Sequence, residues 1–562
     1  MARILQQYQM VYKVYSLYFH TRRATLILKK RLFGEVKRIG TLGKEMLVMK
    51  SSQRISFSRR YPLMNWTSVF VISLVLIFLC VALINILNHE MWRDELQSWL
   101  TAKNSSSLAN LFYNTRYDGQ PTFWCLCLYF LSRFTDNPIV MQIFHLLIAT
   151  TSIYVFARFS PFTKLQKILF SFGYFPLYEY GTISRNYAFG ILFIFGFCAA
   201  FRARFKNYLI PFLFLFMLTQ TSVYGLIIAI SCGSILFFEI IAQGSLLKSP
   251  TTLKVQIVAG LSIFILGISS SIFQLIPPTD SGIAVGWTTH FKTWLTLSTI
   301  WMSYIPIPDF SYHFWNTNIL SSIRLKAFLG CILLGLSIML LSKKPMALLL
   351  YLVGSFGLLA FIYVIFFGFL RHHGHLFILF IASLWISNYY PDQKCEWSFV
   401  NNFNSSLSRY KNRIIVLILS ANLIAGIFAS CVDWVYPFSA SKEVAKFITD
   451  KGMKNMLMLG HSDTVASGVA GHLNRPIYYP NSDRVGSFII FDQKRKPMKS
   501  DEILEKAKNL MAKKKQDLLL ILSYRLNEVP HSVVMVKEFN AGIVADEKYC
   551  LYFMSYNKIH DK

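Results

Sequence analysis

Residues 66–88, WTSVFVISLVLIFLCVALINILN, form a run of 23 residues without a charged side chain. An α-helix rises about 1.5 Å per residue, so a run of this length reaches across a hydrocarbon core about 30 Å thick. This stretch therefore predicts a membrane-spanning helix. We expect it to be kept as an anchor, because its apolar core is longer than that of a cleaved signal peptide.

The rest of the chain extends this prediction. Of its 562 residues 54% are hydrophobic and 15% are charged, whereas about a quarter are charged in a soluble domain. The pattern predicts a polytopic α-helical membrane protein with about eleven spans. The candidate spans are residues 66–88, 138–157, 167–180, 187–201, 207–220, 222–243, 255–276, 326–342, 346–370, 375–389 and 414–432. The run Pro121–Phe134 is predicted to lie along the membrane surface, because fourteen residues are too few to cross.

The net charge of +29 is explained by membrane orientation. Residues 1–63 hold fourteen Lys and Arg and only two acidic residues. With this segment inside, the cytoplasmic parts hold 28 basic and four acidic residues, and the outer loops hold eight of each. Lys and Arg accumulate on the cytoplasmic side of membrane proteins. We therefore expect a cytoplasmic N-terminus, contact with membrane lipids and no nucleic-acid partner.

The chain changes character at about residue 433. Helix-like and strand-like segments alternate from there to the end, which predicts a small extracytoplasmic α/β domain over 433–562. It follows a basic cytoplasmic segment over 1–63 and a membrane module over 64–432. The predicted helices are 441–451, 465–473 and 501–515, and the predicted extended segments are 455–460, 476–479, 517–523 and 549–556.

The first outer loop carries the most informative polar residues. It reads NHEMWRDELQSW over residues 88–99, so Asp94 and Glu95 follow the first span by a few residues. A carboxylate at the membrane surface can accept a proton from a hydroxyl nucleophile while a lipid-borne donor lies alongside in the bilayer. A solvated salt bridge with Arg93 explains the same residues. Residue type leaves both interpretations open.

The order of three motifs adds information. Asp94-Glu95 is followed by YDGQP at 117–121, which opens an aromatic helix, and then by SRNY at 184–187 at an outer membrane edge. This order resembles the GT-C superfamily of polyprenyl-phosphate-sugar glycosyltransferases. Protein O-mannosyltransferases and the lipid A aminoarabinose transferase are the most similar members. The resemblance covers residues 66–201 in detail and the remaining membrane region by architecture.

The resemblance implies roles for individual residues. Asp94 matches the catalytic base of the family and Glu95 matches its partner. Arg185 and Tyr187 match the Arg-x-Tyr pair near the donor phosphate, and Asp118 is expected to contact substrate. The sequence departs from the family at Gln120 and Thr122, where His and a second Pro are usual, so any role of that His is not carried over.

A second polar group stands at RHHGH, residues 371–375. We expect Arg371 to bind the donor phosphate through its planar fork and His372 and His373 to add hydrogen bonds. Two alternatives stay open. His372 and His375 stand three apart, as metal ligands on one helical face would, or the histidines contact lipid headgroups. No Cys or acidic partner is near, so the expected reaction needs no cofactor, with a divalent metal as the alternative.

Two further features lie on the outer side. Glu179 precedes Arg185 at the same membrane edge and is either a second acidic residue of the substrate site or the ion partner of Arg185. The long loop at 277–325 is rich in aromatic residues. It is predicted either to close over bound substrates or to rest at the interface.

Together these features predict an inverting sugar transfer on the extracytoplasmic face. The donor would be a polyprenyl-phosphate sugar, the acceptor a hydroxyl of a lipid, glycan or protein, and the location a bacterial inner membrane. A transporter or flippase is an alternative, but it calls for broken spans in two matching halves. A membrane scaffold for envelope assembly, acting through residues 433–562, is another.

Overall fold

The computed structural model describes residues 66–248, 250–282, 292–393 and 398–557. The basic segment predicted at residues 1–63 lies outside this range. One compact unit of the chain comprises residues 64–233 and 258–562. All contacts discussed below lie within this unit.

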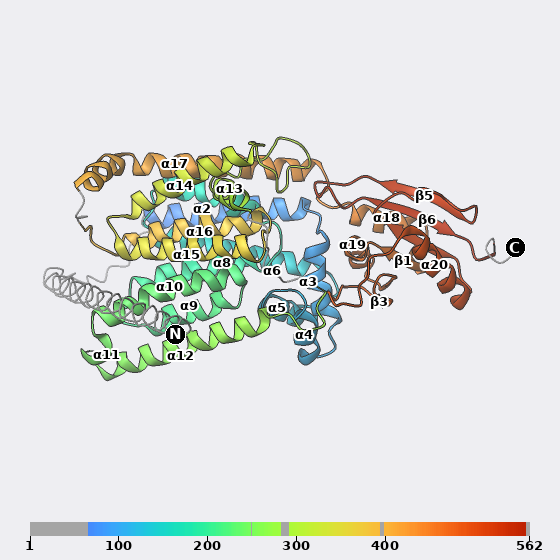
Figure 1. The fold of residues 1–562 in the computed structure, drawn as a ribbon, viewed down its shortest axis with the longest axis horizontal. Helices are drawn as coiled ribbons and strands as arrows, with labels where there is room; N and C mark the ends of the chain where they lie inside the picture. The colour runs from blue at the N-terminus through green and yellow to red at the C-terminus, as the bar shows by residue number, and fades with distance from the viewer. Residues whose placement is uncertain (1–65, 249, 283–291, 394–397, 558–562) are drawn as a thin grey trace, which may run out of the picture. The chain divides into compact units, whose positions relative to one another are not determined.

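Helices make up the described chain as far as residue 435 (Figure 1). They are α2 (Trp66–Asn88), α3 (Arg93–Asn104), α4 (Leu108–Thr115), α5 (Phe123–Leu131), α6 (Ile139–Phe159), α7 (Lys164–Ser171), the π-helix η2 (Tyr174–Glu179), α8 (Tyr187–Phe201), α9 (Leu209–Thr219), α10 (Val223–Ala242), α11 (Ser245–Lys248), α12 (Thr251–Leu275), α13 (Thr293–Tyr304), α14 (Ile323–Leu341), α15 (Pro345–Val364), α16 (Leu370–Ser387) and α17 (Ser398–Val435).

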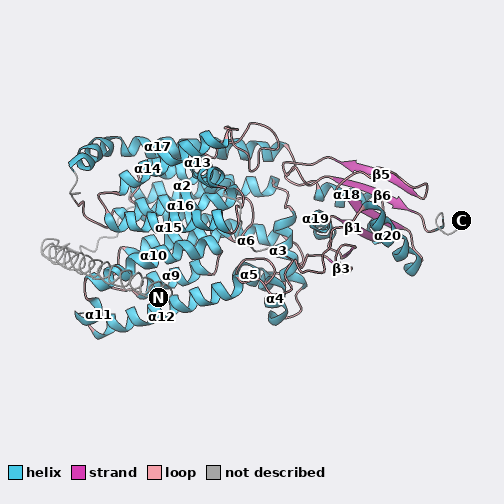
Figure 2. Ribbon diagram, in the orientation of Figure 1, coloured by secondary structure: helices cyan, strands magenta, loops and turns pink. Residues whose placement is uncertain are grey.

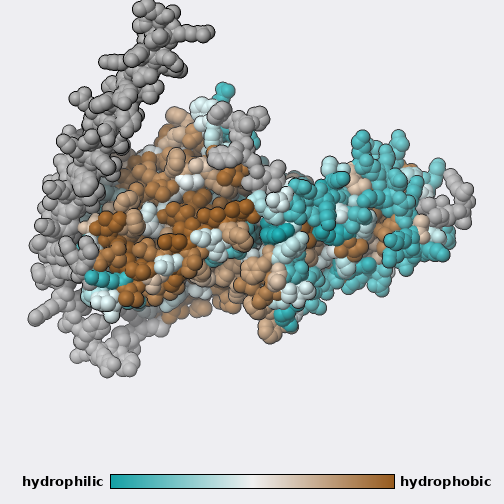
Figure 3. Space-filling model, turned by 60° about the horizontal axis from the view of Figure 1, so that its bottom comes forward, coloured by the Kyte–Doolittle hydropathy of each residue, from teal (hydrophilic) through white to brown (hydrophobic). Residues whose placement is uncertain are grey.

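Seven of the described helices are long and apolar enough to cross a membrane. They correspond to α2, α6, α10, α12, α14, α15 and the part of α17 from Arg409 to Val435. Their outer faces carry large exposed hydrophobic side chains, among them Leu87, Phe273 and Phe356, which are 71%, 82% and 77% exposed. Figure 3 shows hydrophobic side chains gathered over the helical region, whereas hydrophilic ones cover most of the C-terminal domain. Such an apolar surface indicates a membrane-embedded protein.

The count of eleven spans is not confirmed. Helices α8 and α9 have only 15 and 11 residues, and the predicted span 167–180 is divided between α7 and η2. Helix α16 is buried along its whole length and begins with polar residues. A helix enclosed by other helices does not have to match the hydrocarbon thickness, so hydropathy and length alone do not fix the number of spans. The run Pro121–Phe134 contains α5, whose nine residues are too few to cross.

The predicted outer loop at 277–325 is more structured than expected. Its described part contains α13, which packs against α14 and α16. The segment after α13 then leads to Trp315, whose ring contacts Trp92 at 4.7 Å between centroids. The loop therefore contributes a packed helix and a buried aromatic contact in addition to interface residues.

The C-terminal part forms a small α/β domain, as predicted (Figure 2). Its sheet has the order β3-β2-β1-β4-β6-β5, in which β2, β1 and β4 are parallel and the other pairings are antiparallel. The strands are β1 (Leu457–His461), β2 (Ile477–Tyr479), β3 (Arg484–Gly486), β4 (Leu518–Leu522), β5 (Val533–Phe539) and β6 (Tyr549–Met554). The helices are α18 (Ser441–Asp450), α19 (Asp463–Leu473) and α20 (Ser500–Lys514), with a short 3-10 turn at Met453–Asn455.

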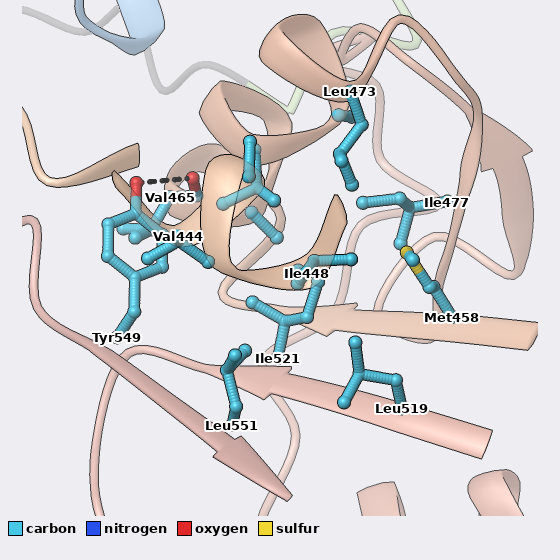
Figure 4. Close-up of a cluster of buried hydrophobic side chains, with 14 of the residues drawn as sticks. Val444, Ile448, Met458, Val465, Leu473, Ile477, Leu519, Ile521, Tyr549 and Leu551 are labelled. Carbon is cyan, nitrogen blue, oxygen red and sulfur yellow. Dashed lines mark hydrogen bonds between the residues drawn. The ribbon is translucent and has the colours of Figure 1, made fainter. Parts of the chain in front are cut away.

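Alternation along β4 explains how helices cover both faces of this sheet. Leu519 and Ile521 pack in a cluster with α18 and α19, as Figure 4 shows. Leu518, Leu520 and Leu522 pack in a second cluster with α20. Side chains at alternate positions of a strand point to opposite faces, so an all-apolar strand is suited to lie between two helical layers.

Candidate active site

Asp94 lies in the first turn of α3, between two arginines from distant parts of the chain. Its Oδ2 is 2.8 Å from Nη1 of Arg185 and 3.4 Å from Nη2 of Arg371. Arg185 comes from the segment before α8, and Arg371 from the start of α16. Burial alone would raise the pKa of Asp94, but Arg185, Arg371 and Arg93 together lower it below its usual range. Asp94 is therefore a carboxylate at neutral pH. It lies in one site with Arg185 and Arg371, as we expected from the sequence.

Aromatic rings surround Arg371. Its guanidinium carbon is 5.4 Å from the ring centre of Trp92, 5.3 Å from Trp315 and 4.7 Å from Phe369. Cations are attracted to the faces of such rings, and more strongly away from water. The rings also restrict where the guanidinium can point. Trp92 and Trp315 were not predicted as site residues, although the aromatic character of their loops gave a signal.

Tyr187 lies beside Arg185, with the guanidinium carbon 5.9 Å from its ring centre. Its ring also contacts His372 and His375, at 5.8 and 5.4 Å between ring centres. The two residues of the Arg-x-Tyr motif thus face the same polar cluster. The structure brings Arg185, Tyr187 and the 371–375 segment together, as the sequence led us to expect.

Glu95 has surroundings different from those of Asp94. Its carboxylate is fully buried and accepts hydrogen bonds from the backbone N–H of Ser184 at 2.6 Å and of Trp92 at 3.2 Å. His89 Nε2 lies 3.0 Å from the same carboxylate. Because Ser184 precedes Arg185, Glu95 ties α3 to the segment that carries the arginine. This geometry suits a positioning residue rather than a group that contacts substrate.

His89 continues this network and was not predicted. Its Nδ1 is 2.7 Å from Oδ2 of Asp433, near the end of α17. Burial would lower the pKa of His89, but the carboxylates of Asp433 and Glu95 raise it to about 10. A protonated His89 therefore joins the end of α17 to α3. The position of Asp433, more than three hundred residues away, gave no signal in the sequence.

Glu179 ends the π-helix η2. Its Oε2 accepts hydrogen bonds from the hydroxyl of Tyr174 at 2.8 Å and from Nε1 of Trp315 at 3.1 Å. The structure places Glu179 and Arg185, both described, without an ion pair between them. The ion partner of Arg185 is Asp94, so that alternative for Glu179 is wrong. π-Helical turns are frequent at functional sites.

The three histidines of the 371–375 segment bond to the backbone. His372 Nδ1 accepts from the N–H of Phe369 at 2.8 Å, which caps α16. His373 Nε2 lies 2.9 Å from the carbonyl of Phe367, and His375 Nδ1 lies 3.0 Å from the carbonyl of His372. In the described part of the chain, no group of three or more His, Cys, Asp or Glu side chains is arranged to hold a metal ion.

Asp118 lies on the turn between α4 and α5. The turn is fixed by a 2.8 Å hydrogen bond between the hydroxyls of Thr115 and Thr122, and by a 2.8 Å bond from the hydroxyl of Tyr117 to Asp280. Asp118 is partly exposed, and its charge interacts with Arg185 and Asp94. It therefore belongs to the same electrostatic cluster, and its contact with substrate stays a prediction.

Several hydrogen-bond donors of this cluster have no partner. Among the described residues, Nε of Arg185, Nε of Arg371 and the hydroxyl of Ser184 are buried without one. Buried polar groups are normally hydrogen-bonded. These donors leave the site with unused capacity to bind an anion.

The C-terminal domain also contacts α3. The side-chain amide of Gln97 exchanges two hydrogen bonds with the backbone of Ile489, at 2.7 and 2.9 Å. Arg93 forms an ion pair with Asp546 at 2.6 Å. Nothing in the sequence pointed to these contacts. They attach the helix that carries Asp94 to the C-terminal domain.

No protein-family model matches this chain, and no curated protein matches its sequence. Its function must therefore be inferred from the site itself.

Proposed function

We propose that this membrane protein is a glycosyltransferase of the GT-C type. It moves a sugar from a polyprenyl-phosphate carrier to an acceptor hydroxyl on the extracytoplasmic face, with inversion at the anomeric carbon. The observation that carries this proposal is the carboxylate of Asp94 held between the guanidinium groups of Arg185 and Arg371.

Two guanidinium groups face a single oxygen of Asp94, so several of their hydrogen-bond donors remain unused. A carrier phosphate offers more acceptor oxygens than the carboxylate and binds the planar fork of arginine in a bidentate manner. It would also satisfy the unpaired Nε atoms of Arg185 and Arg371. The lipid tail of the carrier can stay in the bilayer, because apolar helices form most of the surrounding chain.

In the proposed reaction, the acceptor oxygen attacks the anomeric carbon on the side opposite the phosphate. The bond between that carbon and the phosphate oxygen breaks, and the lipid phosphate leaves with the electron pair. The hydroxyl proton passes to a carboxylate of the site, for which the resemblance to the GT-C superfamily implies Asp94. Fixed guanidinium groups stabilise the charge that develops on the leaving oxygen, so the residues present can supply this stabilisation themselves.

The test uses the purified full-length protein with radiolabelled polyprenyl-phosphate sugars, and follows the loss of label from the lipid. We expect the wild-type protein to release the sugar and Asp94→Asn to abolish release. Asp136→Asn is the matched control, because Asp136 lies in the same outer loop with an exposed side chain paired to Lys103. Unimpaired turnover of Asp94→Asn would remove Asp94 from the reaction.

The same assay separates the alternatives. A flippase would move the lipid across the membrane of a vesicle without releasing the label. A scaffold would show no release and would tolerate the loss of Asp94 and Arg185. We further propose a bacterial inner membrane as the location, with the N-terminus in the cytoplasm and the C-terminal domain outside, as the positive-inside rule favours.

A further inference from the structure

The C-terminal domain contacts helix α3, which carries Asp94, from one end of the helix to the other. At its start, Nη2 of Arg93 lies 2.6 Å from Oδ2 of Asp546. At its end, Nδ2 of Asn104 donates a 2.8 Å hydrogen bond to the hydroxyl of Ser487. The residues of α3 that contact this domain are Arg93, Leu96, Gln97, Leu100, Lys103 and Asn104. Their spacing of three and four residues places them on one face of the helix.

Other residues of α3 contact the membrane module. Asp94 pairs with Arg185 at 2.8 Å, and Glu95 accepts a hydrogen bond from the backbone N–H of Ser184 at 2.6 Å. Helix α3 also packs against α5. The position of Asp94 relative to the arginine therefore depends on how α3 is held between the membrane module and the C-terminal domain.

A glycine lets α19 lie close to α3 (Figure 1). Gly471 is buried near the end of α19. A Cβ added to it would lie 3.1 Å from Cδ1 of Leu96, 3.2 Å from Cδ1 of Leu100 and 3.3 Å from Cβ of Leu96, closer than the usual contact of about 3.5–4.0 Å between carbon atoms. Both leucines are buried, so neither has free space to turn into. Any side chain at position 471 would therefore displace α3.

Directional hydrogen bonds fix the same arrangement on both sides of Gly471. Nε2 of His472 lies 3.2 Å from the carbonyl of Met91, just before α3. Further along α3, the side-chain amide of Gln97 exchanges hydrogen bonds of 2.7 and 2.9 Å with the backbone of Ile489. Such bonds weaken steeply when their geometry changes, so α3 does not slide freely along the domain.

We infer that the C-terminal domain sets the position of α3, and with it that of Asp94, and that Gly471 is the positioning residue on which this depends. The domain then contributes to turnover without contacting the substrate. The effect on turnover rests on the proposed function, because it requires Asp94 to take part in the reaction. The effect on the position of α3 does not.

The test compares two glycines of α19. Gly471→Ala and Gly471→Val add a small and a larger side chain against α3. Gly468→Ala is the matched control, because its Cβ would lie 3.0 Å from Cβ of Ser441, within the C-terminal domain. A misplacement of about 1 Å can cost about 10²-fold in rate, so we expect kcat for label release to fall about threefold in Gly471→Ala and about tenfold in Gly471→Val. Gly468→Ala should keep the wild-type kcat, and the donor KM should change little in all three variants.

A compensating substitution separates positioning from a general loss of stability. Leu96→Val shortens the side chain that the new Cβ of Gly471→Ala would meet. Residues in contact show coupled effects, whereas independent effects add. The double variant Gly471→Ala/Leu96→Val should therefore recover most of the kcat that Gly471→Ala loses. Additive losses in the double variant would contradict a positioning role.

Amide hydrogen exchange over residues 93–104 gives a second measurement that does not need turnover. Weaker docking raises the population of locally open states, in which amide hydrogens exchange. Exchange in α3 should therefore become severalfold faster in Gly471→Val. It should stay at the wild-type rate in Gly468→Ala, which leaves the contact with α3 unchanged.

The outcomes distinguish the two proposals. If the wild-type protein releases no sugar from any polyprenyl-phosphate donor, the proposed function fails, and exchange in α3 still decides whether the C-terminal domain holds this helix. If the wild type is active and Gly471→Val keeps its kcat and its exchange in α3, only the inference about Gly471 fails. An equal loss of kcat in Gly468→Ala would also overturn it, because the loss would then come from the domain as a whole.

Discussion

Two partly buried ion pairs in this protein differ in how the carboxylate is shared. In the C-terminal domain, Arg495 donates two hydrogen bonds to Asp463, from Nε at 2.7 Å and from Nη2 at 2.8 Å. In the membrane module, Asp94 faces the two arginines Arg185 and Arg371 through a single oxygen. The first pair joins one charge of each sign and uses both carboxylate oxygens.

The difference separates a structural ion pair from a binding site. A bidentate pair of one positive and one negative charge satisfies both carboxylate oxygens, and it holds α19 against the segment at Arg495. A carboxylate oxygen shared by two guanidinium groups leaves buried hydrogen-bond donors without partners. Such an arrangement is unfavourable without a ligand, and it becomes favourable when an anion binds. This contrast predicts that mutation will affect turnover at one pair and stability at the other.

Of the two ion pairs, the larger effect of a substitution is expected at Arg185. Arg185→Ala should lower kcat/KM by about 10²–10³-fold, the usual loss when one donor to a developing negative charge is removed. The kcat/KM of Arg185→Lys should lie between those of the wild type and Arg185→Ala, because lysine keeps the positive charge but lacks the planar donor fork of arginine. Arg525→Ala is the control, since Arg525 is 67% exposed and pairs with Glu538 on the domain surface. A fully active Arg185→Ala protein would contradict a phosphate site at the cluster.

A smaller effect, on stability alone, is expected at Asp463. Asp463→Ala leaves Arg495 partly buried without its partner, which should destabilise the C-terminal domain by about 2–3 kcal/mol. The measurement is the thermal unfolding midpoint of the full-length protein, with kcat determined per folded molecule. We expect a lower midpoint and an unchanged kcat. A loss of kcat without a change in unfolding would instead place Asp463 in the function of the protein.

The sequence predicted those parts of the molecule that local patterns determine. Uninterrupted apolar runs gave the long helices, and the all-apolar run at Leu518–Leu522 gave the central strand. Motif order led to Asp94 and Arg185, and the polar group at 371–375 led to Arg371; the structure brings the three residues together. Strand β5 was missed because several of its residues are exposed at the sheet edge and a bulge interrupts its pairing.

Other parts of the site depend on packing between distant segments, which local patterns do not encode. His89 pairs with Asp433 across 344 positions, and Trp315 reaches Arg371 from a loop that showed only an aromatic composition. The count of eleven spans is not confirmed for a related reason, since hydropathy does not distinguish a helix facing lipid from one enclosed by other helices. α16 is the example, because it is buried along its whole length.

The smallest effect is expected at Glu95, the neighbour of Asp94 in the same cluster. Glu95→Gln keeps an oxygen that can accept from Ser184, but removes one of the two negative charges beside His89. The link between α3 and Arg185 should loosen, so kcat should fall by about tenfold, equivalent to about 1.4 kcal/mol. Donor KM should change little, since neither guanidinium group is lost.

The pH dependence of kcat/KM for Glu95→Gln tests whether Glu95 only positions α3. If Glu95 only positions α3, the variant keeps the pH midpoint of the wild type at a lower plateau, because the base itself is unaltered. Glu95→Asp is the matched control, since it keeps the charge beside His89 but is too short to reach Ser184. It should show a similar loss of kcat with the same midpoint. A shifted midpoint in Glu95→Gln would place Glu95 in the proton path, because a change in positioning alone does not alter the pKa of the base.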